Sequence, residues 1–246
     1  MCRRHLPLRK IAVVSGVDTN SPASSKPGAA EVIEDLKPRL RGWLHTNAAL
    51  VSLVSGATLV SVSAALRGLT AGLATTVYSL TVTLLFASSA LYHRYPWSPR
   101  GRQLMKRVDH SMIFVFIAGT YTPITVLALH GATAVAVLFV VWSGAVAGVV
   151  LQCGWPDAPR WLSVPCYVAL GWVAVFVAPQ LVESSNIAAL VLIAAGGIVY
   201  TIGGIVYAVR RPNPVPAVFG FHEVFHLCTL VAATCHYIAI WLIVFA

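Results

Sequence analysis

Apolar runs of about 20 residues recur along this chain, and they constrain its fold more than any other feature of the sequence. A helix of about that length crosses the hydrocarbon core of a bilayer. Ala, Gly, Ser and Thr are frequent within the runs, and small residues let membrane helices approach one another closely. We therefore predict an all-α polytopic membrane protein, a seven-transmembrane helix bundle with spans at residues 47–66, 71–93, 109–129, 132–152, 161–181, 187–209 and 218–245.

The composition indicates that lipid, and not water, surrounds most of the chain. Hydrophobic residues make up 58% of the 246 residues and charged residues only 10%, and the mean hydropathy is +0.79. A soluble domain carries about 25% charged residues. A chain with this deficit cannot cover a globular core with polar groups, so we exclude a soluble enzyme or binding module.

Basic residues are placed unevenly, and their placement predicts the orientation of the bundle. The net charge is +9, and with seven spans every Lys and Arg except Arg67 falls on one side of the membrane. The positive-inside rule makes that side cytoplasmic, which gives a cytoplasmic N-terminus and an external C-terminus in the cell (plasma) membrane. The basic excess thus indicates topology and contact with membrane lipids, and no nucleic-acid partner.

The first 46 residues are polar and basic, and we predict a cytoplasmic tail at 1–46 followed by the transmembrane domain at 47–246. Residues 19–30, rich in Ser, Pro and Ala, have the composition of a disordered segment. Residues 31–44 form either a short interfacial helix, interrupted by Pro38, or a solvated tail. The sequence leaves both open.

Five polar residues of the predicted spans fall at one depth, in the cytoplasmic third of the membrane. Ser89 and His93 end the second span, Asp109 begins the third, and His222 and His226 begin the last. The two histidines of the last span are four residues apart, so they share one face of a helix. Ionisable groups at membrane depth are costly and usually functional.

Three neutral imidazoles, from His93, His222 and His226, suit a zinc ion. Such an ion keeps one position for water and lowers the pKa of that water towards about 7. Asp109 would orient the water or act as general base, and Ser89 would hydrogen-bond an oxyanion or hold Asp109. A single histidine in an apolar helix is more often a packing residue, but the shared depth favours a metal.

The sequence HEVFH at 222–226 also fits the HExxH pattern of zinc proteases, in which Glu223 would be the general base. An intramembrane metalloprotease is therefore an alternative, although it leaves His93 without a role. For other polar residues we expect simpler roles. His236 makes a buried hydrogen bond, His45 is either close to the site or merely interfacial, His110 is set aside, and the five cysteines pack as small apolar residues.

Three separated motifs resemble the signature of the hemolysin III family: SALYH at 89–93, Asp109, and FGFHEVFH at 219–226. That family belongs with the progestin and adiponectin receptor (PAQR) family and, more distantly, with the alkaline ceramidases. The resemblance covers about residues 40–246 and does not explain the long polar N-terminus. It implies a seven-helix bundle with an intracellular N-terminus and zinc held by His93, His222 and His226. It also implies Asp109 near the bound water, with Ser89 alongside.

The resemblance further implies a hydrolase-like site for an amide in a lipid such as a ceramide, and a link to membrane homeostasis. We favour a zinc-dependent lipid hydrolase of this kind. A seven-helix receptor or sensor with structural zinc is the second hypothesis, and a cytolysin or channel is the third. No span carries a stripe of charges that would line a channel. The last lysine is Lys106, so a retinal Schiff base in the later helices is excluded.

Overall fold

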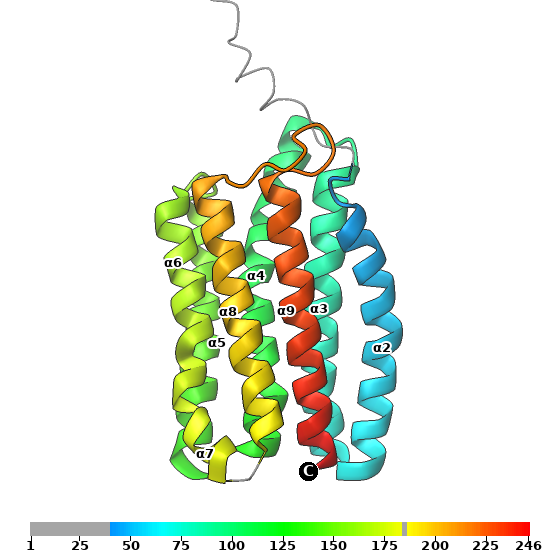
Figure 1. The fold of residues 1–246 in the computed structure, drawn as a ribbon, viewed down its shortest axis with the longest axis vertical. Coiled ribbons are helices and arrows are strands. Elements are labelled where there is room, and N and C mark those ends of the chain that lie inside the picture. The colour runs from blue at the N-terminus through cyan, green and yellow to red at the C-terminus, as the bar shows by residue number, and fades with distance from the viewer. Residues whose placement is uncertain (1–39, 184–185) are drawn as a thin grey trace, which may run out of the picture. The chain divides into compact units, whose positions relative to one another are not determined.

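The computed structural model describes residues 40–183 and 186–246, which form a bundle of helices (Figure 1). The elements are α2 (Trp43–Arg67), α3 (Leu69–Arg94), α4 (Pro99–Ala128), α5 (Gly131–Gly154), α6 (Arg160–Gly171), the 3₁₀-helix η1 (Trp172–Phe176), α7 (Ala178–Glu183), α8 (Ile187–Val209) and α9 (Phe221–Phe245). The all-α prediction is confirmed for the part of the chain that is described. The predicted disordered segment at 19–30 and most of the segment at 31–44, for which a helix and a solvated tail were both left open, lie outside that part.

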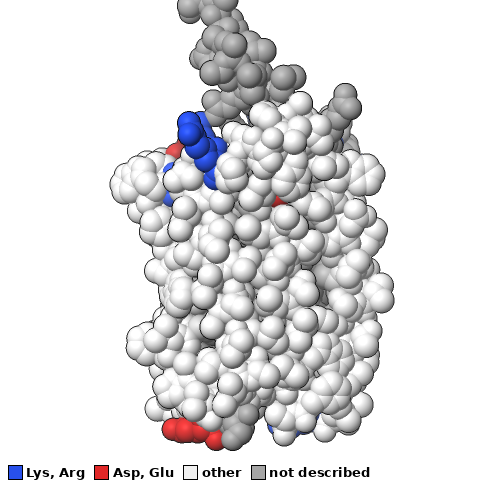
Figure 2. Space-filling view, in the orientation of Figure 1, with Lys and Arg blue, Asp and Glu red and all other residues white. Residues whose placement is uncertain are grey.

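Six of these helices are long and apolar enough to span a membrane, namely α2, α3, α4, α5, α8 and α9. Their outward faces carry exposed large hydrophobic side chains, among them Leu50, Phe139 and Ile205. Figure 2 shows a surface almost without charge between the two ends of the bundle. Because such a surface is costly in water, the chain is a multi-pass membrane protein.

The predicted span at 161–181 is not one continuous helix. Its residues form α6, η1 and α7, and the apolar helix Arg160–Phe176 is shorter than the six candidate spans. Pro165 lies inside α6, where it removes a backbone donor, and Gly171 ends α6. Figure 1 shows α6 beginning at the end of the bundle where α9 begins, and α7 at the opposite end. The seventh crossing stays a prediction.

Neighbouring helices hold the place where this segment breaks. The Tyr121 hydroxyl, on α4, donates to the carbonyl oxygen of Gly171 at 2.5 Å. The Trp172 indole N–H donates to the Thr201 hydroxyl, on α8, at 3.0 Å. Polar groups at membrane depth must find partners inside the protein, so these contacts allow a non-α stretch there.

Two helices begin at least four residues earlier than the apolar pattern predicts. Helix α4 begins at Pro99 and not at residue 109, because the Ser98 hydroxyl accepts the Gly101 N–H and proline suits a first turn. Helix α2 begins at Trp43 and not at residue 47. Apolar runs mark the part of a helix that lies in lipid, whereas the helix itself continues into the interface.

One end of the bundle, which we call the basic end, gathers the starts of α2, α4 and α9 and the last turn of α3 (Figure 1). Helix α9 packs along α8 and also contacts α2 and α4. Lys and Arg side chains gather at this end (Figure 2). Among the described residues, Arg67 is the exception, because it lies in the last turn of α2. The uneven placement of basic residues therefore persists in the folded chain.

Candidate metal centre

The sequence HEVFH opens α9, and its glutamate fixes that opening. Glu223 is buried, with 1% of its surface exposed. One carboxylate oxygen accepts the Gly220 N–H at 2.9 Å, and the other accepts Arg41 Nε at 2.8 Å. The first contact is half of a capping box, which satisfies a free donor at the helix start. With both oxygens engaged, Glu223 is poorly placed to act as the general base of a protease.

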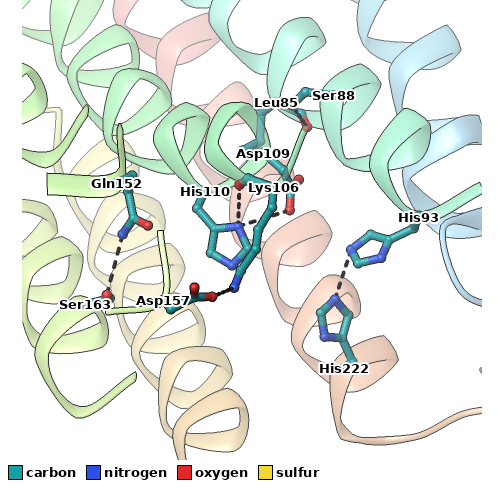
Figure 3. A network of polar contacts seen from close by, with 10 residues as sticks. All are labelled: Leu85, Ser88, His93, Lys106, Asp109, His110, Gln152, Asp157, Ser163 and His222. Carbon is teal, nitrogen blue, oxygen red and sulfur yellow. Dashed lines mark hydrogen bonds and ion pairs between the residues drawn. The ribbon is translucent and has the colours of Figure 1, made fainter. Parts of the chain in front are cut away.

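Three histidines from two helices converge at the basic end. His93 lies in the last turn of α3, and His222 and His226 lie in the first two turns of α9. One ligand atom from each lies within 4.8 Å of the other two. The Nε2 atoms of His93 and His222 are 3.1 Å apart, and Figure 3 shows the two rings pointing toward one another. His93 and His226 are buried and His222 is half-buried.

This donor set has the chemistry of a zinc site, and one pair of its nitrogens has the spacing that zinc requires. Two nitrogens held at about 2.0–2.1 Å by one tetrahedral ion lie about 3.3 Å apart. The separation of 3.1 Å between His93 and His222 is close to that value. Imidazole suits zinc and other transition metals better than magnesium or calcium. The residues fit the ion, and their role as ligands stays a prediction.

Asp109 and Ser89 are neighbours beside the histidines. Ser89 is buried on α3, and its side chain lies within hydrogen-bonding reach of the Asp109 carboxylate on α4. The Asp109 side chain is 14% exposed, and its Oδ2 lies 3.7 Å from Nδ1 of His110. Figure 3 shows Asp109 in the same region as His93 and His222. Among the described residues, the group of mutually close ligand atoms contains the three histidines and not Asp109.

A salt bridge at the basic end joins α4 to the connection between α5 and α6. Lys106 Nζ donates to Asp157 Oδ1 at 2.7 Å (Figure 3). This hydrogen bond holds the pKa of the Asp157 carboxyl below its ordinary value. Both side chains reach solvent, so the pair contributes little to stability.

Two further histidines lie beside the site. The sequence left the role of His45 undecided and set His110 aside. The ring of His45 lies parallel to that of His226, with centroids 3.8 Å apart. His110 lies beside Asp109 although an ideal helix turns adjacent residues about 100° apart. An ionisable residue in the first turn of a membrane span is costly and therefore usually functional. On this ground the sequence could have predicted that His45 belongs to the site.

Two of the simpler sequence interpretations can be compared with the structure. His236 Nε2 pairs with the carbonyl oxygen of Ile193 at 3.2 Å, so the predicted hydrogen bond is present, and it is partly buried. Within the described residues, Cys153, Cys166, Cys228 and Cys235 are free thiols, and the first two are exposed on the outer surface. None of the four belongs to the histidine group.

Known proteins match much of the chain. The chain is 32% identical over 136 residues to "Hemolysin-3 homolog" of Bacillus subtilis (strain 168), which is 55% of this chain and 63% of that protein. It is 32% identical over 132 residues to "Hemolysin-3" of Bacillus cereus, 54% of this chain and 60% of that protein. It is 25% identical over 171 residues to "Monocyte to macrophage differentiation factor" of Homo sapiens, 67% of this chain and 68% of that protein.

The matched region thus spans less than two thirds of each bacterial relative. The family described as "Haemolysin-III related" matches residues 34–237, a range that contains all three histidines together with Ser89 and Asp109. Because this match covers most of the chain, the protein belongs to the haemolysin III-related family.

Proposed function

We propose that this protein is a zinc-dependent hydrolase of a lipid amide of the ceramide kind, and that it acts in membrane homeostasis. The zinc would be held by His93, His222 and His226 near the cytoplasmic face. The proposal rests on the buried cluster of three imidazoles at the basic end of a membrane bundle. Three histidine ligands leave a coordination position for water, as in catalytic zinc sites.

The contact between His93 and His222 is the observation that carries the proposal. These residues are 129 positions apart in the chain, yet their Nε2 atoms lie 3.1 Å from one another. Burial of ionisable rings at membrane depth is costly unless each ring finds a partner. One hydrogen bond joins only the nitrogens of this pair. A shared cation would use all three nitrogens.

Asp109 and Ser89 supply the proton chemistry in this proposal. Bound zinc would polarise a carbonyl oxygen and make a bound water more acidic. The Asp109 carboxylate would take a proton from the attacking water and return it to the departing amine nitrogen. Ser89 would donate its hydroxyl proton to the same carboxylate and so keep Asp109 in position. The separation of Asp109 from the ligand group suits a base better than a fourth ligand.

Membrane lipids are the proposed partners because of where the site lies. The outer surface of the bundle is apolar, and the histidines lie at the end of α3 and the start of α9, near one end of the bundle. A lipid substrate would keep its chains in the bilayer while its amide reaches the basic end. Amides near the headgroup region of sphingolipids have this amphipathic form, so a ceramide-like amide fits better than a water-soluble peptide.

Release of fatty acid from a ceramide by the purified protein in lipid vesicles tests the proposal. We expect zinc-loaded wild type to release fatty acid, and Asp109→Asn to be slower by about 100-fold or more while it keeps its zinc. His130→Ala, at an exposed position away from the basic end, is the matched control. Zinc-loaded wild type that hydrolyses no lipid amide would contradict the proposal and favour the receptor with structural zinc.

A further inference from the structure

A fourth imidazole, that of His45, packs against the candidate metal centre without belonging to its ligand group. Its ring is stacked on that of His226, with centroids 3.8 Å apart and an interplanar angle of 8°. Phe86 lies against it as well, with centroids 5.1 Å apart at a tilt of 57°. Only 3% of His45 is exposed. His45 is thus held between an apolar ring and one of the proposed ligands.

Hydrogen bonding does not explain how this ring is held. Both ring nitrogens of His45 are buried, and in the described part of the protein neither has a hydrogen-bond partner. The backbone of His226 approaches the ring without reaching hydrogen-bond geometry. An unpaired buried polar group is costly. Contact between ring faces must therefore determine where the His45 side chain lies.

The segment that carries His45, residues 40–46, is fastened to both helices that supply the proposed ligands. Arg41 bonds Glu223 at the start of α9. Arg94, next to His93 on α3, donates to the Thr46 hydroxyl at 3.2 Å. These contacts hold the first turn of α2, and with it the backbone of His45, against α3 and α9.

Gly42 allows this close approach. It has a φ of 80°, in the left-handed region that favours glycine. A Cβ atom there would lie 2.7 Å from Cγ of Arg94 and 3.1 Å from Cβ of His93. The guanidinium of Arg94 also lies over the ring of Trp43, 4.3 Å from its centroid. The start of α2 therefore packs directly against the residue that supplies one proposed ligand.

We propose that His45 is a positioning residue of the metal centre, which sets the orientation of the His226 ring by stacking on its face. Residues that position a metal-bound histidine usually do so through a hydrogen bond to the ring nitrogen that does not bind the metal. Here the contact is through the ring face. An aromatic residue without nitrogens can therefore replace His45, whereas a small residue cannot. The inference rests on the proposed zinc site where it concerns zinc affinity. Where it concerns the orientation of the His226 ring, it does not depend on zinc.

Two variants separate stacking from the chemistry of the ring nitrogens. His45→Phe keeps a flat ring against His226, and His45→Ala removes it. Zinc affinity is measured by competition with a chelator, and the orientation of His226 by NMR of protein labelled with ¹³C in its histidine rings. The His226 signal is assigned by its loss in His226→Ala. The NMR experiment is carried out on metal-free protein as well, so it decides the inference even if wild type binds no zinc.

We expect His45→Ala to weaken zinc binding by about tenfold or more, and to move and broaden the His226 signal in both states. The zinc affinity of His45→Phe should stay within about threefold of wild type, a smaller change than the loss of a group that positions a metal-bound histidine usually causes. The His226 signal should still be displaced by the neighbouring phenyl ring. An unchanged His226 signal in His45→Ala would overturn the inference. Loss of zinc in His45→Phe as complete as in His226→Ala would also overturn it, because His45 would then act through a nitrogen.

Discussion

The polar residues at the basic end differ in their hydrogen-bond and ion-pair partners. These partners separate residues with a structural role from residues with a chemical one. Both oxygens of Glu223 are engaged by Arg41 and by the Gly220 N–H. The nitrogens of His93 and His222 face one another, and Asp109 reaches Ser89 and His110. Glu223, whose two oxygens both bond to the fold, has a structural role, whereas the histidine nitrogens that point toward one another suit a shared ligand.

Replacement of Glu223 by glutamine tests this distinction. The change removes the charge that pairs with Arg41 and keeps the size of the side chain. Removal of one partner from a buried ion pair costs about 3–5 kcal/mol, and we expect about 1–3 kcal/mol because Arg41 is partly exposed. Thermal unfolding in detergent measures the loss, with exposed Glu183→Gln as the control.

Bound zinc should remain near the wild-type amount in Glu223→Gln. A variant as stable as wild type that has lost all hydrolytic activity would contradict the structural role. That result would restore Glu223 as a general base.

At the scale of the helices, run length and hydropathy were sufficient to predict most of the bundle. Helix α8 has the predicted bounds, at residues 187–209, and four other candidate spans begin within four residues of prediction. The region at 161–181 could not be predicted as broken. Its break depends on partners in other helices, Tyr121 on α4 and Thr201 on α8.

The site could be predicted in part for a similar reason. The depth of the three histidines followed from the basic residues and the order of the spans. The partner of Glu223 lies 182 residues away in the chain, and no local pattern reveals it. The stacking of His45 on His226 is also a tertiary contact, which only the packing of α2 against α9 determines.

Close packing between helices predicts the effect of adding one methyl group. A Cβ atom at Gly148, on α5, would lie 2.3 Å from ring atoms of Phe114 on α4. Phe114 is 2% exposed and lies edge-on to Tyr167, so its ring has little room to move. We expect Gly148→Ala to lower the unfolding free energy by about 1–3 kcal/mol.

The matched control is Gly197→Ala on α8, because a Cβ atom there meets nothing within 4 Å. That substitution should be neutral or slightly stabilising, since alanine favours a helix over glycine by about 1 kcal/mol. Equal melting temperatures for the two variants would show that α5 does not pack on α4 in this way.

At the scale of the whole molecule, the distribution of charge predicts orientation. Basic residues gather at the end where α2 and α9 begin, which the positive-inside rule makes cytoplasmic. The predicted seven crossings would then place the C-terminus outside the cell. A reporter phosphatase that is active only outside the cytoplasm should be active when fused to the C-terminus. A fluorescent protein fused at the same place should not fluoresce.

An N-terminal tag protected from external protease fixes the other end of the chain. A protected N-terminus together with a fluorescent C-terminal fusion would mean an even number of crossings. In that case the segment formed by α6, η1 and α7 does not cross the membrane.

The central proposal is that three histidines on two helices hold one zinc ion. Metal analysis of protein purified without chelators tests it most directly, for wild type, His93→Ala, His222→Ala, His226→Ala and the control His130→Ala. Circular dichroism and size-exclusion chromatography verify that each variant is folded. We predict about one zinc per chain in wild type and in His130→Ala, and a large loss in each of the other three. Folded wild type without metal, or zinc retained in all three variants, would contradict the proposal.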